Sequence, residues 1–164
     1  MEKIAIFSGS FDPITNGHLD ILKRGLSLFD KIIVVVSTNE QKTYTFSSKE
    51  RITLVKQVCQ SLDNVYVIGH TKGLLIDVAK HYQAIAILRG VRQTADLLYE
   101  QTMSCYNQDI ETVILLTKPE YSHISSSGVK TFYKLGGDIK AMVPPVVHHA
   151  LRERLLIETL EMTE

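Results

Sequence analysis

The chain has 164 residues, of which 45% are hydrophobic and 22% charged, and its 18 basic and 18 acidic residues give a formal net charge of zero. This length and composition predict a single globular domain over residues 1–164, with a real buried core. The charge balance argues against a general nucleic-acid binder, which needs a basic excess, and against an acidic disordered chain.

The chain lacks the sequence features of secretion and of membrane insertion. No apolar run approaches the about 18 residues that cross a bilayer, and the N-terminal apolar stretch is too short for a signal peptide. Cys59 and Cys105 are too few for a disulfide framework and lack the spacing of metal ligands. We therefore expect a cytoplasmic protein with two buried thiols, and one disulfide between them as the alternative.

Short β-branched runs alternate with longer segments of helical period. In chain order the pattern predicts a strand at residues 3–7, a helix at 17–29, a strand at 31–37, a helix at 47–61, a strand at 65–68 and a helix at 74–82. It continues with a strand at 84–88, a helix at 94–106, a strand at 112–117, a helix at 125–135 and a last helix that follows Pro144-Pro145 and ends near residue 160. Ser47 and Glu50 form a capping box, and Gly136-Gly137 ends the fifth helix.

This alternation predicts an α/β fold, with a five-stranded parallel sheet, helices on both faces and right-handed crossovers. Residues 31–37 are almost continuously apolar, which is typical of a strand buried on both faces. Ligands of such sheets bind beyond the carboxyl ends of the strands. Functional residues are therefore expected just after Phe7, Ser37, Ile68, Leu88 and Thr117.

The loop after the first strand is a candidate phosphate site. Gly9 and Gly17 allow close backbone approach, and Ser10 offers a hydroxyl and an N–H group. His18 falls in the first turn of the next helix, where unpaired N–H groups and the helix dipole favour an anion. The alternative is a plain strand–helix turn. The loop matches neither a P-loop nor a dinucleotide fingerprint.

Three motifs carry a family resemblance. Residues 9–18, GSFDPITNGH, resemble the Thr/His-x-Gly-His signature of the nucleotidyltransferase superfamily, and residues 124–127, ISSS, resemble its second signature. Residues 89–100, RGVRQTADLLYE, resemble the phosphopantetheine adenylyltransferase family of bacteria. The resemblance runs from Ile4 to about the last helix, and it implies a Rossmann-like nucleotidyltransferase fold.

The resemblance implies an enzyme that transfers the adenylyl group of ATP to 4′-phosphopantetheine, giving dephospho-coenzyme A and pyrophosphate. It further implies a homohexamer, feedback inhibition by coenzyme A, and Mg²⁺ that accompanies ATP without a protein cage of its own. Alternatives are a nicotinate- or nicotinamide-mononucleotide adenylyltransferase or a cytidylyltransferase, which residues 89–100 disfavour. A non-catalytic nucleotide-binding module is a further alternative, disfavoured by His18 and Lys42. Neither nucleic acid nor a membrane is an expected partner.

The resemblance also implies roles for individual residues. His18 is expected to stabilise the transition state, Lys42 to bridge the two reacting phosphates, and Ser10 to hold substrate and nucleotide. The residues expected to bind ATP are Ser10, Phe11, His18, Gly90, Val91, Arg92, Glu100, Tyr121, Ser122, His123, Ile124, Ser125, Ser126 and Ser127. The residues expected to bind the phosphopantetheine substrate are Ser10, Lys42, Leu74, Leu75 and Arg89. No metal-ligating residue is expected.

Several of these residues also have an ordinary structural interpretation. Arg89 and Arg92 suit bidentate phosphate binding, and the alternative pairs them with Asp96 and Glu100 along a helix face. Lys42, taken alone, is a solvated lysine. In either case the basic residues gathered after the strands predict a strongly positive crevice within a neutral chain.

The remaining candidates leave similar alternatives open. Leu74 and Leu75 are core residues by default, and which of them lines a pantetheine channel stays open. Residues 125–127 offer hydroxyl and N–H groups to a phosphate, or form an N-cap with two further serines. Lys130 faces the same anion or solvent. Departures from the family pattern at Leu97-Leu98 and Asn107-Gln108 bear on oligomer and inhibitor contacts more than on the reaction.

Overall fold

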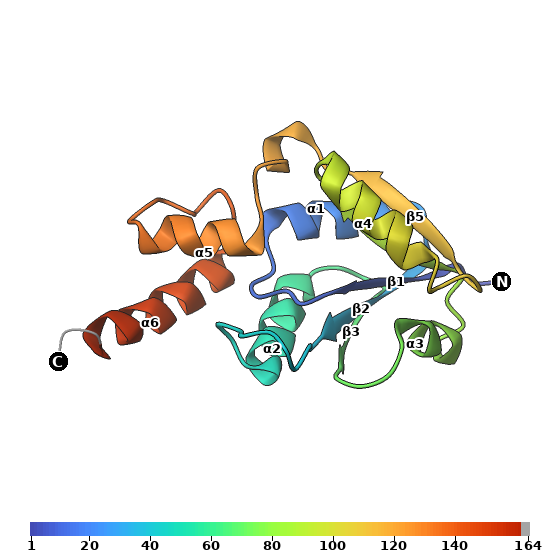
Figure 1. Cartoon of the computed structure of the whole chain (residues 1–164), viewed down its shortest axis with the longest axis horizontal. Coiled ribbons are helices and arrows are strands. Elements are labelled where there is room, and N and C mark those ends of the chain that lie inside the picture. Colours follow the sequence, from blue (N-terminus) through green and yellow to red (C-terminus); the bar gives the residue numbers. More distant parts are fainter. Residues whose placement is uncertain (162–164) are drawn as a thin grey trace.

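The computed structural model describes the backbone of residues 1–161 and the side chains of residues 1–155. Its strands are β1 (Ile4–Gly9), β2 (Lys31–Ser37), β3 (Val65–His70), β4 (Ala86–Val91) and β5 (Glu111–Leu116). Its helices (Figure 1) are α1 (Asn16–Gly25), α2 (Ser48–Cys59), α3 (Leu75–His81), α4 (Thr94–Ser104), the 3₁₀ helix η1 (Pro119–Tyr121), α5 (Ser126–Lys134) and α6 (Pro145–Glu161). The predicted α/β class is confirmed.

The five strands form one parallel sheet in the order β3-β2-β1-β4-β5. β1 lies at the centre, where Ile6 is in register with Ile33 of β2 and Ile87 of β4. The chain builds outward from β1 to β3 and then crosses to the other side for β4 and β5. The order therefore reverses between β1 and β4, which is where open α/β sheets bind ligands.

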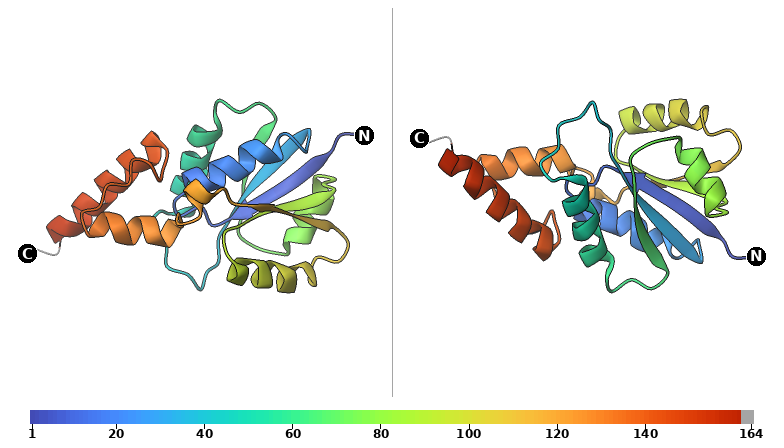
Figure 2. Two further views of the ribbon diagram at one scale, coloured as in Figure 1. Left: turned by 90° about the horizontal axis from the view of Figure 1, so that it is seen from above. Right: turned by 90° about the horizontal axis from the view of Figure 1, so that it is seen from below.

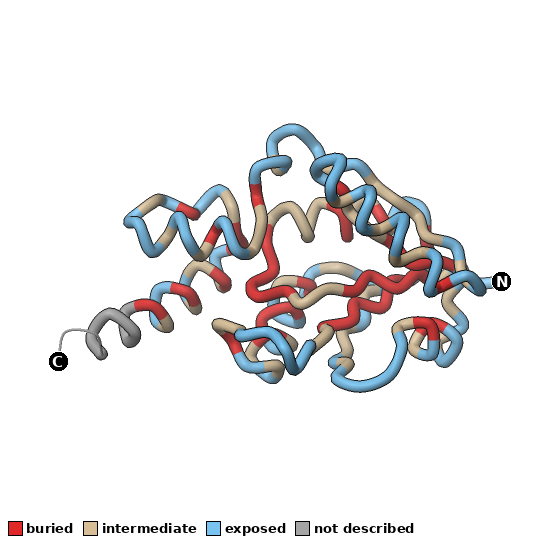
Figure 3. Tube along the Cα trace, in the orientation of Figure 1, coloured by how far each residue is buried: buried red, intermediate tan, exposed pale blue. Residues whose placement is uncertain are grey.

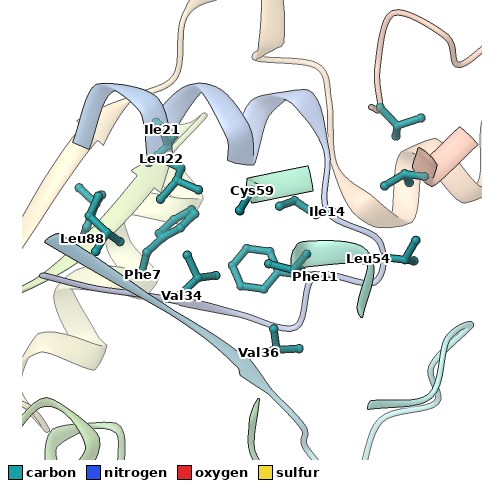
Figure 4. Close-up of a cluster of buried hydrophobic side chains, with 14 of the residues drawn as sticks. Phe7, Phe11, Ile14, Ile21, Leu22, Val34, Val36, Leu54, Cys59 and Leu88 are labelled. Carbon is teal, nitrogen blue, oxygen red and sulfur yellow. The ribbon is translucent and has the colours of Figure 1, made fainter. Parts of the chain in front are cut away.

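Alternate residues of the central strands enter two apolar cores, one on each face of the sheet. The larger core joins Phe7, Val34 and Leu88 to Leu22 of α1 and Leu54 of α2 (Figure 4). On the other face, Ile6, Ile33, Val35 and Ile87 pack against Ala79 of α3. Figure 2 shows α1 and α2 on one side of the sheet and α3 and α4 on the other. This confirms helices on both faces.

The last two helices extend the larger core beyond the carboxyl ends of the strands (Figure 1). Val129 of α5 and Val147 and Leu151 of α6 are buried in it, and the tube in Figure 3 shows this alternation of buried and exposed turns. α5 is followed by Gly136 with φ +85°, a conformation that glycine adopts without strain. Within the described part of the chain, no helix has both the length and the apolar character of a membrane span.

The structure corrects several predicted boundaries. β4 runs on to Val91, so Arg89 lies inside the strand, whereas the sequence placed it just after. α1 ends at Gly25, four residues before the predicted end, and the buried ring of Phe29 belongs to the following turn. The 3₁₀ helix η1 was not predicted. Pairing with a neighbouring strand, which extends β4, is not encoded in the local pattern.

One cysteine prediction is wrong. Cys59 is buried in the larger core, but Cys105 is exposed, and both are free thiols. Cys105 caps the C-terminal end of α4, a helix with no buried residue, and so it lies at the surface. Burial raises the pKa of the Cys59 thiol to about 11.

Candidate active site

A cleft of about 550 Å³ opens where the sheet order reverses, at the carboxyl ends of β1 and β4. Segments from distant parts of the chain line it. The loop after β1 contributes Ser10, the loop after β2 contributes Lys42, β4 contributes Arg89, and the start of α5 contributes Ser126. The cleft therefore lies where the strand pattern predicted a ligand.

The loop after β1 folds back under the cleft around an aromatic side chain. Phe11 adopts φ +47° and is 2% exposed, with its ring edge-on to Phe7 at 5.5 Å and to His18 at 5.1 Å between centroids. A Cβ at Gly9 would stand 3.2 Å from that ring, so a larger residue would fit here only if the ring moved by a few tenths of an ångström. Phe11, expected to bind ATP, lines the cleft mainly as the support of the His18 imidazole.

The N-cap of α1 holds this imidazole in place. Thr15 Oγ1 accepts a hydrogen bond from the His18 backbone N–H at 3.3 Å, and the Thr15 backbone N–H donates to His18 Nδ1 at 3.0 Å. Because Nδ1 accepts, the neutral ring carries its proton on Nε2. Burial, and to a smaller degree the charge of Arg92, lower the pKa of His18 to about 4. At neutral pH the ring is uncharged and offers Nε2–H to a ligand.

Asp12 forms a polar network that the predicted site did not include. Its carboxylate accepts from the backbone N–H groups of Thr45 at 2.9 Å and Phe46 at 3.0 Å, and from the Lys130 ammonium at 2.9 Å. These three donors compensate a carboxylate whose residue is only 5% exposed. The network ties the first loop to the loop that carries Lys42. In the sequence, an Asp before a proline indicates only a turn, so this role had no distinct signal.

Arg51 is a second residue that sequence reasoning missed. It is 0% exposed and lies beneath the cleft on α2. A signal was present, because Arg51 precedes the buried Leu54 and Val55 by three and four residues and so shares their helix face. A charged residue on a buried face needs partners, and those of Arg51 belong to the loops around the cleft.

Both arginines of the predicted site are held by acidic residues of α4. Arg89 Nε lies 3.1 Å from Glu100 Oε2, and Arg92 Nε lies 3.2 Å from Asp96 Oδ2. The pairing alternative is therefore realised, while all four side chains still line the cleft. Burial raises the pKa of Glu100, and the charge of Arg89 opposes that rise.

The three serines of the second motif have three different environments. Ser125 is the N-cap of α5, and its Oγ accepts from Gly128 N–H at 3.0 Å. Ser126 Oγ donates to the Pro13 carbonyl at 2.8 Å, which fastens α5 to the first loop. Ser127 is exposed and lines the cleft. The N-cap interpretation thus holds for Ser125, whose side chain takes the Gly128 amide, and the amide groups of Ser126 and Ser127 at the start of the helix are the ones placed to meet an anion.

Five residues of the predicted site do not line the cleft, namely Leu74, Leu75, Val91, Ser122 and His123. Val91 is buried at the end of β4, and Ser122 Oγ donates to the Pro119 carbonyl at 2.9 Å, which closes the turn after η1. Leu75 packs against the smaller core, whereas Leu74 is 65% exposed at the start of α3. Of the two leucines, Leu74 is the one available to a ligand.

The crevice is less positive than the sequence suggested. Among the described residues that line it, four basic side chains stand against three acidic ones, namely Lys42, Arg89, Arg92 and Lys130 against Asp12, Asp96 and Glu100. Three of the four basic groups are paired with these carboxylates. Lys42 makes no ion pair within the described residues, so it is the cation that a phosphate meets first.

Comparisons with known proteins agree with this geometry. A family model described as cytidylyltransferase-like matches residues 6–132. Two curated proteins from Limosilactobacillus reuteri, of strain DSM 20016 and of subsp. reuteri strain JCM 1112, are named phosphopantetheine adenylyltransferase. Each is 45% identical over 158 residues, covering 94% of this chain and 91% of the relative.

A solved structure from Vibrio parahaemolyticus has the same fold. That protein is assigned provisionally as a nicotinate-nucleotide adenylyltransferase, and it aligns with a TM-score of 0.68 over 96% of this chain and 94% of its own. The two sequences are 22% identical. The likeness therefore supports the sheet order and the helix arrangement, and it leaves the acceptor substrate open.

Proposed function

This chain belongs to the phosphopantetheine adenylyltransferase family, within the cytidylyltransferase-like proteins, and from that premise we propose that it makes dephospho-coenzyme A and pyrophosphate from ATP and 4′-phosphopantetheine. The observation that carries the proposal is the cleft itself. It brings a neutral imidazole donor, a lysine that makes no ion pair among the described residues, and two arginines to the point where β1 and β4 diverge. Such a set of donors suits two phosphorylated molecules placed end to end.

The chemistry is a phosphate attack that needs no general base. An oxygen of the substrate phosphate forms a bond to the α-phosphorus of ATP, and the bond from that phosphorus to the bridging oxygen of the β-phosphate breaks. The attacking phosphate is already ionised at neutral pH, since its second pKa is about 6. A general base would be needed only if the nucleophile were neutral. His18 is neutral and carries its proton on Nε2, so it acts here as a hydrogen-bond donor.

Catalysis then rests on alignment and on charge neutralisation. We assign to His18 Nε2–H the stabilisation of the charge that develops on the ATP phosphates. Lys42 bridges the attacking phosphate and the α-phosphate, and Ser10 holds the junction between both substrates. Arg89 binds the phosphate of phosphopantetheine, with Leu74 available to its pantetheine arm.

The nucleotide is assigned to the other side of the cleft. Arg92, Glu100 and the start of α5 line that side, together with Gly90, Tyr121 and Ile124. Val91, Ser122 and His123 do not line the cleft, so we expect them to contribute through the backbone fold.

Mg²⁺ belongs to the proposal as a partner of ATP. The cleft offers ammonium, guanidinium, imidazole and hydroxyl groups, which suit phosphate oxygens, and its carboxylates Asp12, Asp96 and Glu100 are engaged with cations. Among the described residues, no group of three or more His, Cys, Asp or Glu side chains is placed to hold a metal ion. The residues of the cleft therefore fit a Mg²⁺ ion that is held mostly by phosphate oxygens and water. Such an ion would shield the charge of the triphosphate.

Assembly and control complete the proposal. We propose a homohexamer that coenzyme A inhibits, working in the cytoplasm, as the family resemblance implies. Support for an assembly comes from α4, which has no buried residue and exposes Leu97, Leu98 and Tyr99. Support for inhibition comes from the chemistry, because coenzyme A carries the same pantetheine arm and adenine nucleotide as the substrates.

A pyrophosphate-release assay tests the function directly. We expect release from ATP and Mg²⁺ only when 4′-phosphopantetheine is added, with dephospho-coenzyme A identified by mass spectrometry. Nicotinate mononucleotide as acceptor and CTP as donor serve as controls for the related reactions of this fold. Release that does not exceed the acceptor-free background, or that is as fast with nicotinate mononucleotide, would overturn the assignment.

A further inference from the structure

A buried arginine binds four groups from three segments around the cleft. Arg51 Nη1 donates to the carbonyl oxygens of Ser10 at 2.7 Å and Ser37 at 2.8 Å. Its Nε donates to the Phe46 carbonyl at 3.2 Å, and its Nη2 to Thr38 Oγ1 at 2.7 Å. No carboxylate pairs with this guanidinium within residues 1–155. Among these residues, the charge of Arg51 is therefore balanced by main-chain and hydroxyl oxygens rather than by a carboxylate.

These bonds grip both ends of the loop that carries Lys42. Thr38 lies where the chain leaves β2, and Phe46 lies just before α2 begins. Between them the ring of Tyr44 covers the guanidinium, with 4.0 Å from Arg51 Cζ to the ring centroid. Lys42 lies in the middle of this span, where it is exposed and lines the cleft.

Arg51 also sets the loop against the opposite wall of the cleft. Its bond to the Ser10 carbonyl joins the Lys42 loop to the first loop, which carries both Ser10 and the support of the His18 ring. A guanidinium has five N–H donors in a rigid plane, so it can span carbonyls from separate segments. A lysine has three donors at one point and cannot replace that geometry.

We propose that Arg51 is a positioning residue for Lys42: it fixes the distance of the Lys42 loop from the first loop, so that the ammonium meets both reacting phosphates. The proposal rests on the proposed adenylyl transfer. Arg51 itself touches neither substrate in this scheme. It acts by limiting where Lys42 can lie. A catalytic group that is misplaced by about 1 Å can lower the reaction rate by about 100-fold.

The test compares Arg51→Lys with the wild-type enzyme, alone and in a Lys42→Ala background. We expect Arg51→Lys to lower kcat by about 10- to 100-fold, with the Kd for ATP, measured by calorimetry, within about twofold, because the hydrogen bonds of Arg51 do not go to Arg92, Glu100 or the start of α5. In the Lys42→Ala background the same change should lower kcat by less than about twofold, because the residue it positions is gone. Equal effects in both backgrounds would overturn the proposal.

Two further variants separate positioning from folding. Arg154→Lys is the matched control, since Arg154 pairs with Glu50 and covers the Phe46 ring without touching the loop backbone. It should lower Tm and leave kcat unchanged. Thr38→Val removes one acceptor of Arg51 with little change of shape, and it should lower kcat by about 3- to 10-fold even if Arg51→Lys fails to fold. An unchanged kcat in Thr38→Val would contradict the proposal, whereas an inactive wild-type enzyme would contradict the proposed function instead.

Discussion

The imidazole of His18 shows how backbone geometry selects a chemical role. The Thr15 N–H occupies Nδ1, which leaves Nε2 protonated in the neutral ring. Burial and Arg92 keep the ring neutral, because the charged form would be desolvated beside a guanidinium. A neutral N–H donor strengthens its bond as charge develops on the phosphates, and so it favours the transition state over the ground state.

Replacing this donor tests its role. His18→Ala should lower kcat by about 100-fold or more, the scale of losing one preorganised donor, while ATP affinity changes much less. Steady-state kinetics and ATP titration of the same preparation give both values. His149→Ala is the control, because His149 is an exposed imidazole on α6 that pairs only with Glu153 among the described residues. A His18→Ala enzyme with near-normal kcat would refute the role.

The protonation state of His18 gives a second measurable expectation. Its pKa of about 4 lies below the ordinary histidine value of 6.5, so the folded protein keeps this ring neutral down to acid pH. NMR titration of histidine side chains in the free protein, with His18→Gln for assignment, should show no His18 transition between pH 5.5 and 8. Between pH 6.5 and 4 the unfolded chain binds a proton that the folded one does not, so His18 makes the protein less stable as the pH falls through this range. A His18 midpoint near 6.5 would contradict the neutral-donor mechanism.

Helices α1 and α2 both begin with a capping box, but the two boxes have different functions. In α2, Ser47 and Glu50 form the capping box that the sequence predicted. In α1, Thr15 and His18 form an equivalent box that the sequence did not indicate, because the residue three positions after the N-cap of such a box is normally Glu or Gln. The residue that completes the second box is the proposed catalytic donor, so capping and catalysis share one side chain.

Removing either cap should therefore lower the stability of the protein by a similar amount, but only removal of the α1 cap should lower its activity. Thr15→Ala and Ser47→Ala should each lower the free energy of unfolding by about 1 kcal/mol, the usual cost of losing an N-cap side chain. Urea unfolding measures this. Only Thr15→Ala should also lower kcat, because only its box includes the imidazole, and Thr15→Ser should restore both. Equal kcat in Thr15→Ala and Ser47→Ala would show that the cap does not orient His18.

Local sequence patterns indicated cleft residues that follow strands. They missed the residues whose side chains hydrogen-bond one loop of the cleft to another. Ser10 and His18 belong to a motif that follows a strand end, whereas Lys42 follows a strand end but lies in no motif and was expected from the family resemblance. Asp12 and Arg51 act through backbone atoms of segments far away in the chain, and no short motif encodes such partners. The same limit explains why β4 extends past its predicted end, since residues 89–91 are held in the strand by pairing with β5, which lies more than 20 residues later in the chain.

The arrangement of the sheet explains why the cleft has both signs of charge. The strand alternation predicted the parallel sheet, but the order β3-β2-β1-β4-β5 follows from packing that a single sequence does not display. That order brings α4 beside β4, and its Asp96 and Glu100 form ion pairs with Arg92 and Arg89 in the cleft. A phosphate that enters must compete with these carboxylates, which keeps the arginines oriented before the substrates arrive.

The exposed face of α4 leads to a prediction about assembly. Leu97 is 41% exposed and Leu98 59% exposed on a helix with no buried residue, which is unusual for a helix of a protein that stays monomeric. We expect light scattering after size-exclusion chromatography to give the mass of a hexamer, and Leu98→Glu to give a smaller species because a charge would be buried in the contact. Leu28→Glu, at a 50% exposed leucine after α1, should leave the mass unchanged. A monomeric wild-type protein would contradict the proposed hexamer, and an intact hexamer in Leu98→Glu would place the contact elsewhere.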